Sequence, residues 1–241
     1  MRKITHVLIL TLTFTAPPAV SGQDATGAFL FTYRAHEGQR AAFDEGYRAH
    51  LEWHRTQHDP LTWFGWDVLA GPGIGDFVDG VFGIPFAALD RRVDPAGDAR
   101  DAATNVEAHA APTERAFVRL RRELSTAAPL ESSRSTPLVE VIRYRVPAAA
   151  MAAMDSALRE LRSIADGAAL LEYTIYETAA GTLSPAYIMM IWRAAFDSFD
   201  GIDRDPRLAL RRWLPEGVAE QSQLWLHRPD LTYHATATRA R

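Results

Sequence analysis

The amino-acid sequence contains one pattern twice, and this repeat constrains the fold more than any other feature. Three short matches occur in the same order in both halves, at an offset that falls slowly from 111 to 107 residues. A shared order with a slowly changing offset predicts that one structural unit has been duplicated. The matching pairs are Tyr33-Arg34 with Tyr144-Arg145, Phe86–Asp90 with Phe196–Asp200, and Arg121–Ser125 with Arg228–Thr232.

Each half of the sequence predicts the element order βαββαβ. In the first half, a strand at 29–34 leads into a helix at 38–57 and two strands at 61–69 and 76–83. A second helical region and a last strand follow in both halves, which gives the split βαβ, or ferredoxin-like, motif. The corresponding segments of the second half are 139–145, 148–166, 170–178 and 186–193.

The antiparallel sheet of this motif carries its helices on one face, so the other face needs cover. Two copies in one chain can cover each other. We therefore predict an α+β fold of two ferredoxin-like units packed sheet to sheet as an intramolecular barrel. The predicted organisation is a signal peptide at 1–22, a first unit at 23–126, a linker at 127–136 and a second unit at 137–241.

The first 22 residues have the features of a secretory signal. Two basic residues precede the apolar stretch Val7–Ala16, and the small residues Val20-Ser21-Gly22 predict cleavage near Gly22. The stretch is too short to span a bilayer, and Pro17-Pro18 would end a helix there. We expect a periplasmic or secreted bacterial protein without stable membrane insertion after cleavage.

Composition excludes several classes of protein. The chain has no cysteine, which excludes a disulfide scaffold, thiolate metal sites and thiol nucleophiles. Lys3 is the only lysine, so the mature chain lacks the amine needed for Schiff-base or P-loop chemistry. A net charge of −4 provides no field that favours nucleic acid.

The helix predicted at 38–57 is the most informative segment for function. At 100° per residue, its sheet-facing side carries a phenol and two imidazoles, whereas the second unit has only apolar residues at the same positions. A buried polar group without a partner costs about 1–3 kcal/mol, so the first unit is the expected place for a site. The aligned residues are Phe43, Tyr47, His50 and His54 with Met154, Leu158, Leu161 and Ala165.

Three interpretations of these side chains stay open. In the first, neighbouring side chains and backbone satisfy the polar groups. In the second, the groups line a small-molecule pocket, and its ligand contacts are Phe43 on the helix, Trp63, Trp66 and Phe82 on the strands, and His36 at the mouth. In the third, the histidines bind a metal ion or haem.

The histidine spacing by itself gives little support for a metal ion. His50, His54 and His58 are spaced i, i+4 and i+8, but the outer two lie about 12 Å apart along a helix axis. One ion would reach only an adjacent pair, and no zincin-type glutamate lies between His50 and His54. We therefore predict no metal site and no required cofactor. Haem stays open because it needs only one axial histidine.

The element order, the aromatic second and third strands and the duplicated layout resemble the dimeric α/β-barrel superfamily. That superfamily includes antibiotic-biosynthesis-monooxygenase-like and stress-responsive barrel domains, and the resemblance covers nearly all of the mature chain. It implies a barrel fold. The members include cofactor-independent oxygenases, cyclases and haem-binding or haem-degrading proteins, so the resemblance supports the fold more than a function.

The functional hypothesis is an exported barrel protein with a pocket in its first unit for a small hydrophobic or aromatic molecule. As an enzyme, it would carry out oxygenase-like or cyclase-like chemistry without a cofactor. His50 or His54 would act as general base, Tyr47 would orient the substrate, and Trp63 and Trp66 would stack on it. The alternatives are a non-catalytic protein that binds haem or another hydrophobic ligand, and a structural or interaction module. A homodimer is compatible with each.

Overall fold

The computed structural model describes residues 27–128, 136–181 and 186–235. The predicted signal peptide at 1–22 and most of the predicted linker at 127–136 lie outside these residues. Within the described ranges, no helix is both long enough and apolar enough to cross a membrane.

Both halves of the chain have the element order βαββαβ, with additional short 3-10 helices. The first half comprises β1 (Gly27–Ala35), α1 (Arg40–Thr56), β2 (Phe64–Ala70), β3 (Phe77–Ile84), α2 (Pro95–Asn105) and β4 (Ala110–Leu120). The second half comprises β5 (Leu138–Arg145), α3 (Met151–Ala165), β6 (Tyr173–Gly181), β7 (Ala186–Arg193), α4 (Pro206–Leu210) and β8 (Ala219–His227).

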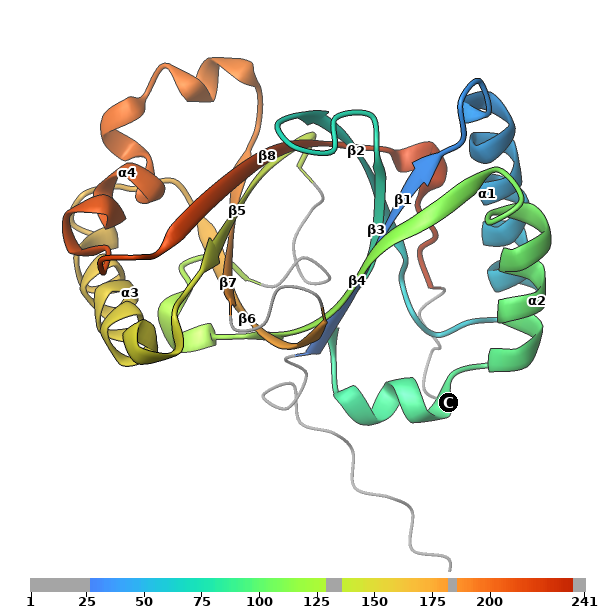
Figure 1. Cartoon of the computed structure of the whole chain (residues 1–241), viewed down its shortest axis with the longest axis horizontal. Coiled ribbons are helices and arrows are strands. Elements are labelled where there is room, and N and C mark those ends of the chain that lie inside the picture. Colours follow the sequence, from blue (N-terminus) through green and yellow to red (C-terminus); the bar gives the residue numbers. More distant parts are fainter. Residues whose placement is uncertain (1–26, 129–135, 182–185, 236–241) are drawn as a thin grey trace, which may run out of the picture.

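The eight strands form one closed antiparallel barrel. The strand order is β4-β1-β3-β2 in the first sheet and β8-β5-β7-β6 in the second, and the β2–β8 and β4–β6 pairs join the two sheets. Helices α1 and α2 lie on one side of the barrel, and α3 and α4 lie on the opposite side (Figure 1). The predicted fold class, two ferredoxin-like units forming an intramolecular barrel, is confirmed.

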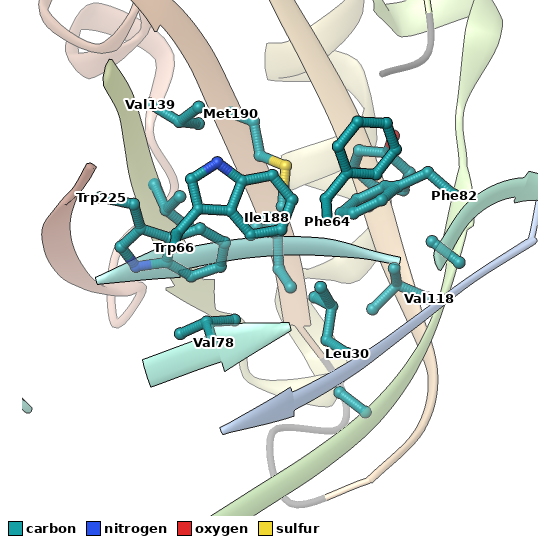
Figure 2. Close-up of a cluster of buried hydrophobic side chains, with 14 of the residues drawn as sticks. Leu30, Phe64, Trp66, Val78, Phe82, Val118, Val139, Ile188, Met190 and Trp225 are labelled. Carbon is teal, nitrogen blue, oxygen red and sulfur yellow. The ribbon is translucent and has the colours of Figure 1, made fainter. Parts of the chain in front are cut away.

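The barrel interior is a packed core shared by both units (Figure 2). Trp66 of β2 and Trp225 of β8 meet there with ring centroids 5.6 Å apart, and Phe82 packs against Trp66 from β3. An eight-stranded barrel is just wide enough for side chains to fill it. The interior therefore joins the two units through hydrophobic burial.

After its last strand, each unit extends into the other unit. Leu124, in the 3-10 helix Arg122–Leu124 after β4, is fully buried in the core beneath α3. Leu231, in the 3-10 helix Pro229–Leu231 after β8, is fully buried in the core beneath α1. The third pair of matching segments, Arg121–Ser125 and Arg228–Thr232, is therefore the place where each unit crosses into the other.

Two arginines start these crossing segments. Each guanidinium bonds one carboxylate on the first helix and one on the second strand of the other unit, so the two halves hold each other with the same polar geometry. The pairs are Arg121 with Asp155 (2.7 Å) and Glu177 (2.9 Å), and Arg228 with Asp44 (3.0 Å) and Asp67 (2.8 Å).

We predict that Leu124→Ala and Leu231→Ala each lower the free energy of unfolding by about 2–5 kcal/mol, the cost of a buried leucine cavity. Because each leucine lies in the other unit's core, each variant should still unfold in one cooperative transition. Urea unfolding followed by tryptophan fluorescence and by far-UV circular dichroism tests this. Two separate transitions, only one of them shifted, would contradict the crossing.

Candidate functional site

A cavity of about 340 Å³ lies between α1, α2 and the helix-facing side of the first unit's sheet. This volume is at the low end of the range for small-molecule sites. Its lining combines aromatic rings with ionisable groups and includes Phe31, Tyr33, His50, His54, Trp63 and Asp98.

A close approach of the two helices shapes this cavity. A Cβ atom at Gly46 of α1 would lie 1.8 Å from the carbonyl oxygen of Asn105, so only glycine allows α2 to pack this closely. At the other end of α2, the Asp94 side chain caps the helix by accepting the Gly97 N–H at 3.0 Å. Together these features bring the acidic face of α2 to the histidines of α1.

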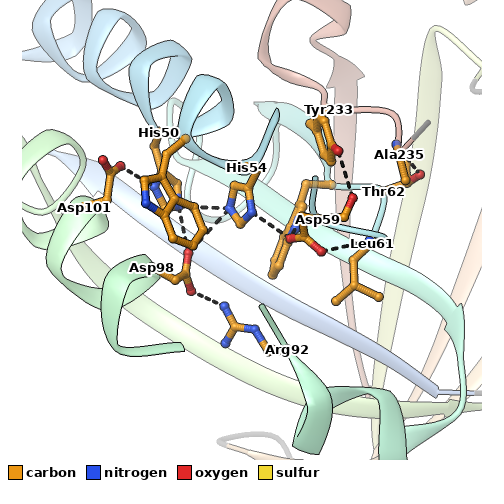
Figure 3. Close-up of polar contacts among 12 residues, drawn as sticks. His50, His54, Asp59, Leu61, Thr62, Arg92, Asp98, Asp101, Tyr233 and Ala235 are labelled. Carbon is orange, nitrogen blue, oxygen red and sulfur yellow. Dashed lines mark hydrogen bonds and ion pairs between the residues drawn. The ribbon is translucent and has the colours of Figure 1, made fainter. Parts of the chain in front are cut away.

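Both histidine rings are held through Nδ1 by a carboxylate (Figure 3). His50 Nδ1 lies 2.7 Å from Asp101 Oδ1, and His54 Nδ1 lies 2.7 Å from Asp59 Oδ2. An ionised carboxylate only accepts hydrogen bonds, so each Nδ1 carries the proton. When a ring is neutral, its Nε2 then carries a free lone pair.

Asp59 accepts hydrogen bonds from other groups besides His54. It also accepts the Leu61 N–H at 2.9 Å and the Trp63 Nε1–H at 3.0 Å. Burial alone would raise the pKa of this carboxyl, but the hydrogen bonds from His54, Leu61 and Trp63 outweigh burial and lower it. Asp59 is therefore ionised at neutral pH and fixes the His54 tautomer.

The two Nε2 atoms and one carboxylate oxygen converge on a single point. The Nε2 atoms lie 3.3 Å apart, and Asp98 Oδ1 lies 3.5 Å from each of them. Asp98 Oδ2 is bound by Arg92, whereas its buried Oδ1 has no hydrogen-bond partner among the described residues. Burial lowers the pKa of His50, His54 lowers it further, and Asp101 acts in the opposite direction.

A second buried carboxyl lines the same cavity. The Tyr47 hydroxyl donates to Asp79 Oδ2 at 2.7 Å, and Asp79 Oδ1 has no hydrogen-bond partner among the described residues. Burial raises the pKa of Asp79 to about 7. The Tyr47 hydrogen bond, Arg92 and Arg115 oppose this shift, and Asp98 adds to it. Asp79 is therefore a neutral acid at slightly acidic pH.

The structure brings together four of the residues that the sequence singled out. Tyr47, His50, His54 and Trp63 all line the cavity. Phe43, predicted to contact the ligand, is not part of the lining, so that prediction was wrong. It is fully buried next to Tyr47, with ring centroids 5.9 Å apart, and supports the cavity from behind.

Three other predicted lining residues lie elsewhere. Trp66 and Phe82 point into the barrel interior, because successive strand residues face opposite sides of a sheet, so their placement in this pocket was wrong. His36 is exposed in the turn between β1 and α1 and is not part of the lining.

The carboxylates Asp59, Asp98 and Asp101 were missed by the sequence analysis. The i, i+3 spacing of Asp98 and Asp101 places both on one face of α2, which is a usable but weak signal. In the second unit Asp205 and Pro206 begin α4 as Asp94 and Pro95 begin α2, which aligns Asp98 with Ala209.

Haem does not fit this histidine pair. An iron bound at about 2 Å from an imidazole Nε2 needs a clear plane for the macrocycle, perpendicular to that bond. Each Nε2 here has the other ring's Nε2 at 3.3 Å and Asp98 Oδ1 at 3.5 Å, which occupy that space. The haem alternative therefore gains no support from the site.

No protein-family model matches the sequence, and no curated protein matches it. The solved structures that are similar in fold include the following three. A candidate monooxygenase from Lactobacillus acidophilus NCFM has a TM-score of 0.56 and 13% identity, over 86% of this chain and 96% of that one. An anthrone oxidase-like protein has a TM-score of 0.54 and 10% identity, over 92% and 99%. A mutant chlorite dismutase from Candidatus Nitrospira defluvii has a TM-score of 0.53 and 11% identity, over 88% and 93%.

This chain folds as a dimeric α/β barrel. Both halves of the barrel come from one chain, and the likeness extends over most of each compared structure. At such low sequence identity the likeness establishes the fold alone, so the function of this barrel has to be argued from its own residues.

We predict that Asp79→Asn stabilises the barrel at alkaline pH. The pKa of Asp79 in the folded state, about 7, exceeds the unfolded value near 4. The neutral carboxyl therefore contributes its full share to the free energy of unfolding below about pH 4, and this contribution is lost as the pH rises to 7. Above pH 7 the free energy of unfolding of the variant should exceed that of the wild type by on the order of 4 kcal/mol at most. The free energies of unfolding of the two proteins should converge near pH 4.

Urea denaturation at several pH values between 4 and 8 measures the difference in unfolding free energy, in which titrations common to both proteins cancel. Asp166→Asn, at an exposed site, is the matched control and should show no such trend. A difference between Asp79→Asn and the wild type that is constant with pH would contradict the raised pKa.

Proposed function

We propose that this barrel is an exported enzyme that acts on a small aromatic molecule in the cavity between α1, α2 and the first sheet. One observation carries the proposal. Two carboxylate-held histidines converge in this cavity, whereas the aligned positions of the second unit, Leu161 and Ala165, are plain core. Buried ionisable groups without a structural counterpart are typical of functional sites.

The cavity walls favour an aromatic ligand that bears oxygen. Phe31 and Trp63 offer ring faces, and each has a guanidinium near it: Arg115 at 5.1 Å from the Phe31 centroid and Arg92 at 5.7 Å from that of Trp63. Ring faces beside cations suit a planar molecule with a phenolate, enolate or carboxylate group. The volume of about 340 Å³ suits a small molecule of this type.

The reactive groups of the cavity differ in protonation state. Asp79, whose pKa burial raises to about 7, is the candidate proton donor, and Tyr47 positions it. The Nε2 lone pairs of His50 and His54 are the candidate electron-pair donors. A proton donor and electron-pair donors in one cavity support chemistry that moves a proton on a phenolic or enolic substrate. Oxygenase-like and cyclase-like reactions require such a step.

We predict that Ala102→Phe abolishes ligand binding, because Ala102 lines the cavity and a phenyl ring would fill it. Ala103→Phe, on the exposed face of the same helix, is the matched control and should leave binding unchanged. Calorimetry with a panel of one-ring and two-ring phenols and quinols measures binding, and an oxygen electrode measures turnover.

Equal binding by Ala102→Phe and Ala103→Phe would remove the cavity as the ligand site. Binding without oxygen consumption or product formation would instead support the non-catalytic ligand-binding alternative. Failure of every panel member to bind the wild-type protein at millimolar concentrations would contradict the proposed substrate class.

A further inference from the structure

We infer that His50, His54 and Asp98 form a binding site for one divalent transition-metal ion, with a coordination position open to the cavity. This inference builds on the proposed active site, because it names the cofactor that the site would use. It also replaces the expectation that no metal is bound.

The separations of the three donor atoms match the requirements of a single ion. A point equidistant from the two Nε2 atoms and Asp98 Oδ1 lies about 2.0 Å from each, given their separations of 3.3, 3.5 and 3.5 Å. Zinc bonds to imidazole nitrogen and carboxylate oxygen are about 2.0–2.2 Å long. In a tetrahedral site with such bonds, neighbouring ligand atoms lie about 3.3–3.5 Å apart.

The electrostatics of this arrangement also favour a cation. Because both Nδ1 atoms lie against carboxylates, the two rings in their neutral form present Nε2 lone pairs to each other and to Asp98 Oδ1. The His50, His54 and Asp98 residues are buried, and Asp98 Oδ1 has no hydrogen-bond donor among the described residues. A metal ion between three buried acceptors that face one point offsets their mutual repulsion and their desolvation.

The surroundings of the three ligands are those of a built metal site. Metal-binding histidines usually donate their second ring nitrogen to a carboxylate, as His50 does to Asp101 and His54 to Asp59. The third ligand is oriented in the same way, since Arg92 binds Asp98 Oδ2 and leaves Oδ1 directed at the imidazoles. Figure 3 shows the three ligands and these supporting groups together.

The donor set selects the class of ion. Two imidazoles and one carboxylate suit Zn²⁺, Fe²⁺ or a similar first-row ion, whereas Mg²⁺ and Ca²⁺ prefer oxygen ligands alone. Three protein ligands leave at least one position for water or substrate, as in catalytic metal sites. When the ion is bound, the imidazole lone pairs are occupied, so His50 and His54 hold the ion and do not act as general bases. Asp79 is then the group of the proposed active site that exchanges a proton with the substrate.

The second unit provides the design for a folded variant without the site. The double variant His50→Leu, His54→Ala introduces the residues that the second unit has at the equivalent, fully packed positions Leu161 and Ala165. Asp59 keeps its hydrogen bonds from Leu61 and Trp63, and Asp98 keeps its bond from Arg92, so the variant should fold while lacking both nitrogen ligands. His58→Ala, in the exposed turn that follows the same helix, is the matched control.

The experiment is a titration of chelator-treated protein with Zn²⁺ by calorimetry and with Co²⁺ by visible absorption. The wild type and His58→Ala should bind one ion per chain, with Co²⁺ bands of low-symmetry coordination and a raised unfolding temperature. The double variant should bind at least 100-fold more weakly, and so should Asp98→Ala. Asp59→Asn and Asp101→Asn should bind about 10–100-fold more weakly, because they disturb only the ligand orientation.

Two results would overturn the inference: no binding of either ion to the wild type at millimolar concentrations, or unchanged binding by the double variant when it is folded by circular dichroism. The metal site and the proposed function can fail separately. Ala102→Phe, which changes no ligand, tests the aromatic cavity, so metal binding without aromatic binding would refute only the substrate class. Aromatic binding without metal binding would refute only the metal site.

Discussion

The crossing of each unit's last segment into the other unit is the interaction on which the rest of the structure depends. It inserts Leu124 and Leu231 into the opposite helix–sheet cores, while the β2–β8 and β4–β6 pairs close the barrel. The site relies on it as well. Tyr233, which follows the second crossing, donates to the Asp59 carbonyl at 2.8 Å and pairs with the Trp63 backbone, so the second unit holds the loop that anchors His54.

Duplication within one chain separates stability from chemistry. A buried cluster of histidines and carboxylates is expensive to desolvate, and its net contribution to folding is small or negative when its charges are incompletely paired. The second unit has no such cluster at the aligned positions and buries aliphatic and aromatic groups there instead. The shared barrel interior adds further apolar burial from both units. One helix–sheet layer can therefore carry polar groups while the remaining layers stabilise the fold.

The elements of the fold were predictable because each has a local signature. The buried face of α1 follows from helical periodicity, and the predicted residues Phe43, Tyr47, His50 and His54 are all buried there. Strand facing was harder to predict. The odd spacing of Trp63 and Trp66 already places them on opposite faces of a strand. The sequence near them does not indicate which of the two faces meets the helices and which meets the barrel interior. Only the barrel's strand pairing decides this.

The sequence by itself determined the duplication, the two ferredoxin-like units and the asymmetry between His50 and His54 and their aliphatic counterparts, because these features arise from residue order and periodicity. The tertiary structure alone decided what the histidines meet. Asp98 and Asp101 reach them through the close approach of α2 to α1 at Gly46, and Asp59 through a loop tied down by the other unit. Convergence of three donor atoms to within 3.5 Å is a property of packing between distant segments, and spacing along the chain does not encode it.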